Sequence, residues 1–565
     1  MSTDIKTLVI FFLITTAICA QSEYPQDYFR KPLDITLVLS GTFGELRASH
    51  FHAGLDIKTQ QKQGLNVFAA ANGYVSRIKI GHYGYGKALY ITHPNGYTTV
   101  YAHLQKFSDR IETYIKDCQY DKESFEIEVF PNSNELPISK SEIIAYSGNT
   151  GGSGGPHLHF EIRDNQERPI NPMLFGIDVK DTKAPFVSAV YAYTKDDSSV
   201  INGSNKRVPL RLIPKKNGSY DVGKITAYGT IGFGITTYDK QDLAPNNNGV
   251  SNIRTFFNGN KSLEIDFKRF SFDETKHIKR LIDYQYYKER KSRIQKLFIQ
   301  KNNPLSLYKN AYDNGYIKVE DSTASVYKIS IRDFDGNETL VHIPIEGKFT
   351  ALNKTNDDAS DKSVVYSDNS TTLEGENITV NFYKNTVYED VYIDFSVNSD
   401  TLHLHTDNIP LQKNFYINYD LSKYKSKDLD KVYIAKLFGH NKKLSYLSTK
   451  RKGHMLRAGS KSLGTFTLAM DTIAPTITPV NFQNKKWLSK YRYLKVKIED
   501  QHTGVSKYRA TVNGKWILME YDYKTHILTH DFNDGVIKDI KNDLKIIVTD
   551  NVGNSSTFEA TFFRK

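Results

Sequence analysis

Cysteine, methionine and tryptophan are scarce in this sequence: among 565 residues there are 2 Cys, 5 Met and 2 Trp. With only Cys19 and Cys118, the disulfide framework that staples many small secreted domains is excluded. If Cys19 is removed with the N-terminal segment described next, no intramolecular disulfide can form. We therefore expect hydrophobic cores, and a bound metal, to supply the stability.

Long apolar runs are also lacking after residue 20. The run at 8–20 (LVIFFLITTAICA) follows Lys6 and precedes Gln21, and at 13 residues it is too short to cross a bilayer. This layout predicts a signal peptide over 1–20, cleaved after Ala20. A lipid anchor at Cys19 is less favoured because Ile18 suits that signal poorly. The mature chain is expected to be exported to the periplasm or the cell exterior, with no membrane span.

Charge and length narrow the class of protein further. The chain carries 75 basic and 63 acidic residues, a net charge of +12. In an exported protein this excess suits polyanionic surfaces such as cell walls better than nucleic acid, or it serves solubility alone. The length predicts three to four domains, and an aromatic content of 12% favours folded, strand-rich ones.

An internal repeat organises the chain after residue 180. Residues 181–193 (DTKAPFVSAVYAY) resemble 471–482 (DTIAPTITPVNF), and each copy closes on an Asp-x-x-Gly-Asn turn followed by a strand. The spacing predicts a mainly β protein in which immunoglobulin-like sandwiches occupy 181–349 and 471–565. A further β-rich domain is expected at 350–470 and the N-terminal domain at 21–180. Apolar residues at helical spacing predict an amphipathic helix within an insertion at 273–300.

Histidine is concentrated in the N-terminal domain, where seven of the 16 lie between positions 50 and 159. Three clusters stand out: His52 with Asp56, His103, and the pair His157 and His159 after the glycine-rich stretch 148–155. Because side chains alternate along a strand, the last two histidines should share one face, about 6.5 Å apart. The glycines allow positive φ and a close approach to a substrate chain, although an ordinary flexible loop is the alternative.

These residue types suit a zinc site. Catalytic zinc takes three protein ligands, typically imidazole nitrogens and carboxylate oxygens, and keeps a fourth position open for water. Two histidines and one aspartate meet that count, and the remaining histidines are free to act on the substrate. A second His-x-His, at 403 and 405, has no such company and is expected to be an exposed strand face. His50 lies two residues before His52, but only His52 has an aspartate four positions later.

The resemblance to a known family is specific. HAGLD (52–56), GYGKALYITHPNGYTTVYAHL (84–104) and SGNTGGSGGPHLHFEIR (147–163) resemble the motifs of the lysostaphin-type zinc metallopeptidases, the M23 or LytM-domain family of peptidoglycan endopeptidases. The match extends over about 35–175. It implies an antiparallel β-sheet peptidase domain with one Zn²⁺ held by His52, Asp56 and His159. His103 and His157 would be catalytic, and the substrate would be a peptidoglycan peptide.

One departure from the family leaves alternatives open. His103 and His157 are separated by 53 residues, more than the compact pattern needs, and 107–136 is expected to form a short helix and a hairpin beside the groove. The alternatives are a non-catalytic LytM-type regulator or wall-binding protein, and a secreted peptidase of glycine-rich proteins. In every case the C-terminal β domains are candidates for contact with a protein or envelope partner.

Overall fold

A computed structural model describes residues 23–351, 362–425 and 428–565. The predicted signal peptide, including Cys19, lies outside the described residues. Within them the chain is mainly β, with few and short helices, which confirms the predicted fold class. No helix in the described part is long and apolar enough to span a membrane.

The N-terminal domain is built on a nine-stranded antiparallel sheet and a smaller three-stranded sheet. The large sheet has the order β1-β2-β11-β6-β5-β4-β8, with β12 paired to β11 and β9 to β4, and the small one has the order β3-β10-β7. The elements are β1 (Leu39–Gly41), β2 (Leu55–Lys58), β3 (Asn66–Phe68), β4 (Gly73–Ile80), β5 (Lys87–Thr92), β6 (Thr98–Ala102), β7 (Lys106–Phe107), α1 (Asp109–Asp121), β8 (Ile127–Val129), β9 (Pro137–Ile138), β10 (Ile143–Tyr146), β11 (His157–Arg163), β12 (Pro169–Ile170) and the 3₁₀ helix η1 (Pro172–Phe175).

Strand β11 lies in the middle of the large sheet and organises the domain. Alternate side chains of β11, Leu158, Phe160 and Ile162, are fully buried in the core, so the opposite face is left for the histidines. Strands β5 and β6 pair as the antiparallel hairpin that the Pro-Asn-Gly turn predicts.

The segment 107–136 differs in part from its prediction. The expected helix is present as α1, but β8 and β9 do not pair with each other as a hairpin. Both pair with β4 instead, at opposite ends of that strand. The long β4 offers an open edge, and pairing with it satisfies more backbone groups than an isolated hairpin would.

The second domain forms a 13-stranded sheet through which β18, 14 residues long, runs as the common strand. Its strands are β13 (Phe186–Thr194), β14 (Val200–Ile201), β15 (Val208–Leu210), β16 (Leu212–Pro214), β17 (Tyr220–Val222), β18 (Ile225–Tyr238), β19 (Asn252–Phe257), β20 (Asn260–Asp266), β21 (Gln295–Lys296), β22 (Tyr308–Lys309), β23 (Ile317–Val319), β24 (Ala324–Arg332) and β25 (Glu338–Gly347), with a 3₁₀ turn η3 (Tyr312–Gly315).

The insertion at 273–300 is not the single amphipathic helix expected. It contains a 3₁₀ turn η2 (Thr275–His277), two short helices α2 (Ile278–Leu281) and α3 (Tyr284–Arg290), and then β21, which pairs with β18. Ile282 is extended and ends α2, and the Asp283 side chain accepts a hydrogen bond from the backbone N–H of Tyr286 and so starts α3. The apolar spacing is real, but its residues are buried by two helices and a strand.

The third and fourth domains each contain two packed sheets. The third has two five-stranded sheets and one small pair: β26 (Ser363–Val365), β27 (Thr371–Gly375), β28 (Ile378–Phe382), β29 (Val391–Ile393), β30 (Phe395–Asn398), β31 (Thr401–Leu404), β32 (Phe415–Asp420), η4 (Leu429–Lys431), β33 (Val432–Phe438), β34 (Lys443–Tyr446), β35 (Thr449–Lys452), β36 (Met455–Ser460) and β37 (Gly464–Met470). The fourth has four- and five-stranded sheets: β38 (Thr476–Pro479), β39 (Lys486–Trp487), β40 (Tyr493–Glu499), β41 (Val505–Val512), β42 (Lys515–Trp516), β43 (Glu520–Asp522), β44 (Ile527–Asp531), η5 (Phe532–Asp534), β45 (Lys541–Asp550) and β46 (Ser555–Phe563).

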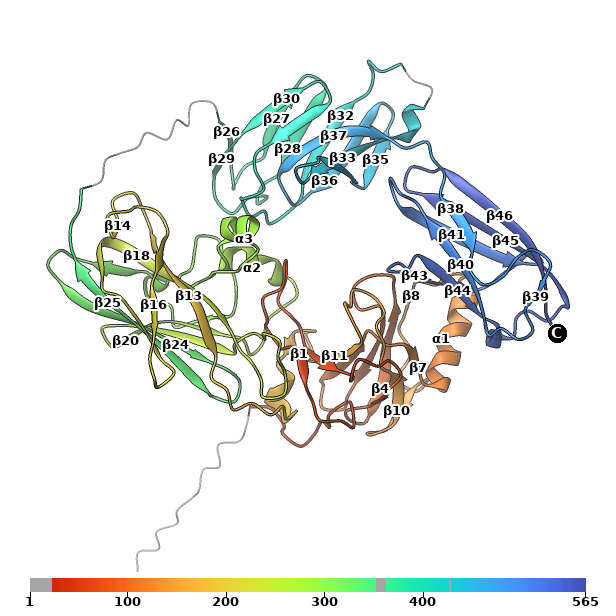
Figure 1. Cartoon of the computed structure of the whole chain (residues 1–565), viewed down its shortest axis with the longest axis horizontal. Coiled ribbons are helices and arrows are strands. Elements are labelled where there is room, and N and C mark those ends of the chain that lie inside the picture. The colour runs from red at the N-terminus through yellow and green to blue at the C-terminus, as the bar shows by residue number, and fades with distance from the viewer. Residues whose placement is uncertain (1–22, 352–361, 426–427) are drawn as a thin grey trace, which may run out of the picture.

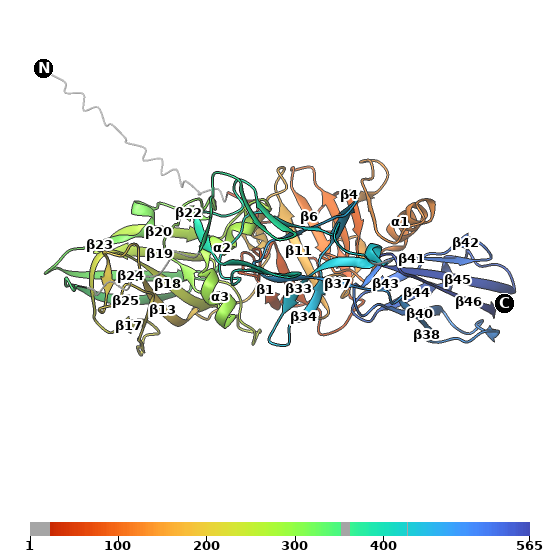
Figure 2. The same cartoon turned by 90° about the horizontal axis from the view of Figure 1, so that it is seen from above.

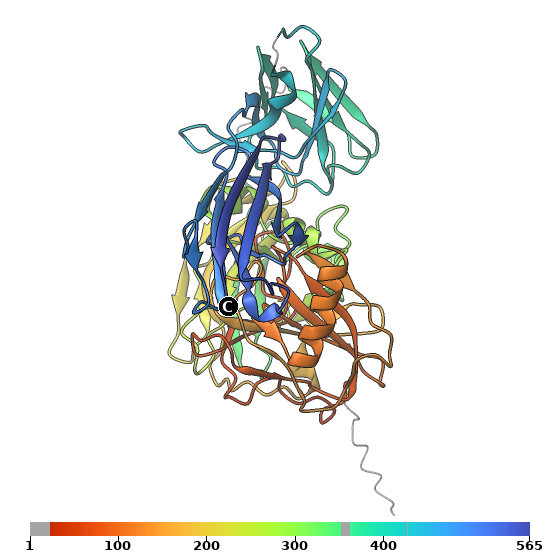
Figure 3. The same ribbon diagram turned by 90° about the vertical axis from the view of Figure 1, so that its right-hand side faces the viewer.

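The four domains follow a closed path, so that the last lies beside the first (Figure 1). Seen from above, the molecule is flat and elongated (Figure 2). Viewed from the side, the strands of the fourth domain stand next to α1 of the N-terminal domain (Figure 3), and there Lys116 Nζ lies 2.6 Å from Asp534 Oδ1. One hydrophobic core runs from the N-terminal domain into the second, whereas the third and fourth domains have cores of their own.

Candidate metal centre

Two adjacent strands and the loop before them bring the first three predicted residues together. Asp56 lies on β2 and His159 on β11, and these two residues are direct partners in the antiparallel register. His52 lies in the loop that leads into β2. His50 is exposed, and its ring Nδ1 lies next to Ser49 Oγ.

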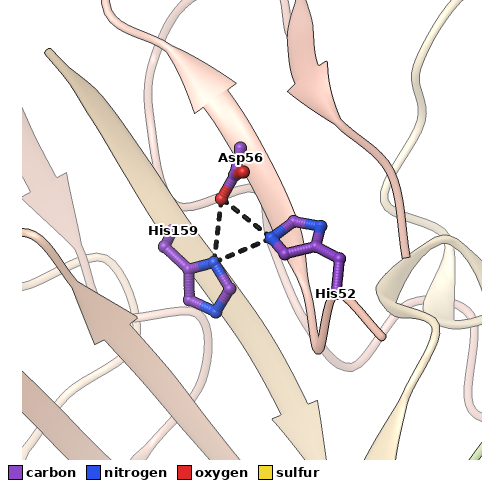
Figure 4. A group of neighbouring side chains, drawn as sticks. All are labelled: His52, Asp56 and His159. Atoms are coloured by element: carbon purple, nitrogen blue, oxygen red, sulfur yellow. Dashed lines mark hydrogen bonds and ion pairs between the residues drawn. The ribbon is translucent and has the colours of Figure 1, made fainter. Parts of the chain in front are cut away.

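The three side chains converge on one point (Figure 4). Asp56 Oδ1 lies 2.9 Å from His52 Nε2 and 2.8 Å from His159 Nδ1, and the two nitrogens are 3.1 Å apart. All three residues are buried, with 3 to 9% of their surface exposed. Ligand atoms around a tetrahedral zinc at 2.0–2.1 Å would lie roughly 3.3 Å apart. The group is thus slightly tighter than a metal site and is compatible with one.

The protons on the two imidazoles show why a cation fits this point. His52 Nδ1 donates to the Thr42 carbonyl (2.7 Å), and His159 Nε2 donates to Glu161 Oε1 (2.8 Å). In the neutral rings, therefore, both remaining nitrogens present lone pairs to the Asp56 carboxylate. Three electron-rich atoms at this distance require a proton or a metal ion among them. The donor set, two nitrogens and one oxygen, is one that zinc accepts.

Electrostatics describe the same competition between proton and metal. Burial alone would raise the pKa of Asp56, but the interactions with His52, His157 and His159 outweigh burial and hold this pKa well below its usual range. Burial likewise disfavours charged His159, yet its hydrogen bonds to Asp56 and Glu161 raise its pKa to about 9. A metal ion must displace this proton, so its binding should weaken as the pH falls.

A layer of outer residues, not predicted from the sequence, holds the ligands in place. Glu161 is fully buried and also accepts hydrogen bonds from Arg163 Nε (2.7 Å) and from the Tyr85 hydroxyl. Arg47 reaches the second oxygen of Asp56 at 3.0 Å. Glu161 could have been recognised, because in a strand positions 157, 159 and 161 share one face. Thr42 and Arg47 leave no comparable pattern.

The other two predicted histidines lie beside the centre. His157 Nε2 is 3.4 Å from Asp56 Oδ1, and the His103 and His157 rings are 4.7 Å apart. Each ring is held through its Nδ1 atom. His103 Nδ1 donates to the Thr150 carbonyl (2.8 Å), and His157 Nδ1 donates to the Gly155 carbonyl (2.8 Å). His103 has a positive φ of 59°, an uncommon conformation for a residue other than glycine. Burial first, and then the neighbouring histidines, lower the pKa of His103 to about 3.

The glycine-rich loop has a more local role than expected. Within 148–155 only Gly151 has a positive φ, 67°, and a Cβ atom there would lie 2.3 Å from the backbone nitrogen of Gly86. Gly151 therefore allows two loops to pack backbone to backbone. Gly154 and Gly155 face open space, so a peptide could still approach them.

The fourth domain contacts the same loop from outside. Lys524 Nζ donates to the Asn149 carbonyl (2.6 Å) and the Tyr523 hydroxyl to the Gly151 carbonyl (3.3 Å). Between the two domains lies a cavity of about 730 Å³ lined by polar and charged residues, among them Thr150. The carbonyl of Thr150 also holds His103, so one wall of the centre is linked to the fourth domain.

Among the residues that the structure describes, the remaining histidines do not form a second metal centre. His93 is buried: its Nδ1 donates to the Asn72 carbonyl (2.8 Å) and its Nε2 lies 2.8 Å from Thr99 Oγ1, as expected of a structural residue. His403 is exposed on β31, whereas His405 follows the end of that strand and bonds Asp394 at 2.8 Å. In the part of the chain that the structure describes, neither belongs to a group that could hold a metal.

Comparison with known proteins matches two parts of the chain to families. Residues 50–119 match the profile of Peptidase family M23, and residues 362–471 that of a Zu5-like domain. The chain is 30% identical over 168 residues to DD-carboxypeptidase/endopeptidase Mpg of Neisseria meningitidis serogroup B, a match covering 30% of this chain and 32% of that protein. It is 34% identical over 122 residues to an uncharacterized metalloprotease of Haemophilus influenzae, covering 22% of this chain and 20% of that protein. The chain thus spans about a third or less of the curated relatives it matches.

Solved structures give a weaker likeness. The catalytic domain of the prophage-encoded M23 protein EnpA from Enterococcus faecalis is 19% identical, with 27% of this chain and 97% of that one covered and a TM-score of 0.20. A TM-score this low supports no conclusion. The match to the family profile and the relatives' sequences do support a conclusion: the N-terminal part of this chain is a peptidase domain of the M23 family.

Proposed function

We propose that this protein is an exported zinc metalloendopeptidase that hydrolyses peptide cross-links of bacterial peptidoglycan. The observation that carries the proposal is the convergence of His52, Asp56 and His159, with His103 and His157 beside them, in an M23-family domain. The name of the Neisseria relative, a DD-carboxypeptidase/endopeptidase, supports the choice of substrate.

Zinc would be held by His52, Asp56 and His159, one ion per chain. When bound, zinc polarises a scissile carbonyl and makes a water molecule a nucleophile near neutral pH. The protein keeps the ligands oriented for it: the Thr42 carbonyl fixes the tautomer of His52, and Glu161 fixes that of His159. Asp56 supplies the one negative charge, and Arg47 holds its second oxygen.

His103 and His157 are proposed as the catalytic histidines. Because each donates through Nδ1 to a backbone carbonyl, each neutral ring has its lone pair on Nε2. That nitrogen can accept a proton from an attacking water and, once protonated, can donate to the oxyanion or to the leaving amine. The low pKa of His103 favours a neutral ring at pH 7 and so the role of hydrogen-bond acceptor.

The remaining parts of the chain are assigned by inference. The apolar segment at 8–20 would export the protein, so that it meets the cell wall in the periplasm or outside the cell. The net charge of +12 would favour binding to the anionic cell wall. The C-terminal β domains would position the peptidase domain and contact a protein or envelope partner.

Two variants separate the proposed metal ligand from a proposed catalytic residue. His159→Ala should lose both zinc and activity, while keeping the far-ultraviolet circular dichroism of the wild type. His157→Ala should keep close to one zinc per chain and lose activity by about 10²-fold or more. His403→Ala, an exposed histidine of the third domain, is the matched control and should change neither. Full activity in His159→Ala would contradict the proposal, whereas a wild type that neither binds zinc nor cuts peptidoglycan would favour the regulatory alternative.

A further inference from the structure

The second domain contains a cluster of carboxylates at its boundary with the N-terminal domain. Oxygen atoms of Asp181, Asp239 and Asp333 lie within 4.8 Å of one another. They come from the linker before β13, the end of β18 and the end of β24, so only the folded domain brings them together. Asp239 and Asp333 are 2% and 5% exposed.

In the described part of the chain the cluster is not neutralised by a direct ion pair. Within residues 23–351, 362–425 and 428–565, no lysine or arginine forms an ion pair with any of the three carboxylates. Asp239 Oδ1 is buried without a hydrogen-bond partner in those residues. Burial, and then the nearby Asp181 carboxylate, raise the pKa of Asp239 to about 8. Like charges held this close are costly unless a proton or a cation lies among them.

The neutral side chain of Gln241 favours a cation over a shared proton at this cluster. Gln241 is 4% exposed, and its Oε1 atom is also buried without a hydrogen-bond partner in the described residues. Gln241, the three aspartates and Thr42 line one small cavity of about 20 Å³. A proton shared between two carboxylates would leave this amide oxygen unsatisfied, whereas an ion in the cavity would bind it. A cavity of this size holds one ion or one water molecule.

The repeat provides an internal comparison. In the fourth domain Asp471, Asp500 and Asp550 form the corresponding cluster, again with oxygens within 4.8 Å. Asn337 and Asn554 brace the two clusters alike: Nδ2 donates to Asp333 Oδ2 and to Asp550 Oδ2, at 2.7 Å in each case. In the fourth domain, however, Asp500, the counterpart of Asp239, accepts hydrogen bonds at Oδ1 from the backbone N–H groups of Thr503 (2.9 Å) and Gly504 (2.6 Å). Among the described residues no such donor reaches Asp239 Oδ1, which makes the second-domain cluster the stronger candidate for a site.

We propose that Asp181, Asp239, Asp333 and Gln241 bind one Ca²⁺ ion at the boundary between the peptidase domain and the second domain. All the donors are oxygen atoms, which suit Ca²⁺ or Mg²⁺ better than zinc or copper. Calcium takes six to eight oxygens at 2.3–2.6 Å, so oxygens up to about 4.8 Å apart fit one coordination sphere. Magnesium at 2.0–2.1 Å demands a tighter octahedron and keeps its waters.

The ion would also steady the peptidase centre. Thr42 lines the cavity, and its hydroxyl accepts from the backbone N–H of Gly249 (2.9 Å) in the loop that follows Asp239. The carbonyl of Thr42 accepts from His52 Nδ1 (2.7 Å). Binding at Asp239 and Gln241 would therefore fix the loop that holds Thr42, and through it the orientation of His52. This inference goes beyond the proposed activity and does not depend on it.

Equilibrium dialysis of the full, zinc-loaded chain against Ca²⁺ in excess Mg²⁺ tests the proposal, with thermal unfolding as the second readout. We expect saturable Ca²⁺ binding and a rise in Tm of roughly 5 °C at saturation. Asp239→Asn should remove one Ca²⁺ per chain, and without Ca²⁺ it should be at least as stable as the wild type because it relieves the repulsion. Asp500→Asn, the same change in the fourth domain, is the matched control and should keep this ion.

Gln241→Met keeps the proposal testable if Asp239→Asn fails to fold. This variant removes only the amide group and should weaken Ca²⁺ binding about 10-fold. No Ca²⁺ binding by the wild type, the same stoichiometry in Asp239→Asn, or unchanged affinity in Gln241→Met would each overturn the proposal. Equal displacement of Ca²⁺ by Mg²⁺ at the same concentration would overturn the choice of ion.

Discussion

Glu161 connects a proposed metal ligand to the residues around it. It is fully buried and joins His159 to Arg163 and Tyr85. Glu161→Gln keeps the shape but removes the charge that orients His159, so we expect metal affinity to fall by about 10- to 100-fold. Competition with a chromogenic zinc chelator measures this.

A control on the same arginine isolates the effect of Glu161. Glu167 also pairs with Arg163, at 2.9 Å, but its side chain is 60% exposed and does not touch His159. Glu167→Gln should leave metal affinity unchanged. Equal losses in the two variants would mean that Arg163, and not the contact with His159, determines the affinity.

At the scale of residues, the sequence predicts site residues whose side-chain type is distinctive, but it does not predict contacts made by backbone groups. The pattern of histidine and aspartate at 52, 56, 103, 157 and 159 picks out five residues that the structure brings together, and their chemical roles stay predictions. The Thr42 carbonyl could not be found this way, because every residue has a carbonyl and only the fold aims this one at His52.

At the scale of elements, the close packing of the glycine-rich loop 148–155 predicts that one of its glycines cannot be replaced without a loss of stability. In Gly151→Ala the new Cβ meets the Gly86 backbone at 2.3 Å and the residue must keep a φ of 67°, so we expect a loss of about 1–3 kcal/mol in the free energy of unfolding. Displacing the loop also displaces the Thr150 carbonyl from His103, so kcat/KM should fall by at least about 10-fold. Gly154→Ala, which meets no atom within 4 Å, should change stability by less than about 0.5 kcal/mol. Similar effects of both substitutions would refute the packing role of Gly151.

Strand β21 carries a buried lysine that makes stability depend on pH. Burial, and then nearby Arg280, lower the pKa of Lys296 from its usual 10.5 to about 7. Between these two values the unfolded chain binds more protons than the folded one, so the free energy of unfolding should rise with pH, by at most about 1.4 kcal/mol per unit. Lys296→Met should remove this part of the rise, as urea unfolding at pH 7, 8 and 9 would reveal.

The exposed Lys318 provides the control for that experiment. Its side chain is 75% exposed, so Lys318→Met should reproduce the wild-type pH dependence. If Lys296→Met shows the wild-type slope as well, then Lys296 does not carry its proton differently in the folded state.

The same region shows where sequence patterns stop predicting elements. Apolar spacing over 273–300 correctly selects residues that become buried, such as Ile278 and Leu297. It cannot locate the break at Ile282, because the break depends on the pairing of β21 with β18, a contact between segments some 60 residues apart. Tertiary pairing overrides local propensity here. By contrast the β5–β6 hairpin is local, and its turn residues predict it.

At the scale of the whole molecule, the closing contact between the first and last domains includes a buried lysine, Lys87, besides the pair of Lys116 and Asp534. The Lys87 side chain is 6% exposed and its Nζ lies 2.9 Å from Glu520 Oε1. Glu520→Gln leaves that ammonium buried without its counter-charge, so we expect lower stability, by less than about 3 kcal/mol because Glu520 itself is partly exposed. Small-angle scattering should show a more open molecule. Glu559→Gln, on an exposed pair with Lys545, should change little. An unchanged radius and Tm in Glu520→Gln would show that this pair does not hold the domains together.

The closed arrangement could not be predicted from the sequence. Lys87 and Glu520 look like ordinary surface residues in their own strands, and nothing in either segment marks the other as its partner. Length and the internal repeat predict the number of domains, and these boundaries stay a prediction because the first two domains share one hydrophobic core. Their mutual contacts depend on surface shape, which a single sequence does not display.

The central claim is that the M23-family domain uses zinc to cut peptidoglycan peptides. The most direct test is mass spectrometry of soluble fragments released from purified peptidoglycan by the mature chain, with zinc, with a chelator, and with zinc restored after the chelator. We predict peptide-cleaved fragments with zinc, none with the chelator, and their return when zinc alone is restored. Release that persists in the chelator, or no release from several wall types by the zinc-loaded chain, would contradict the claim.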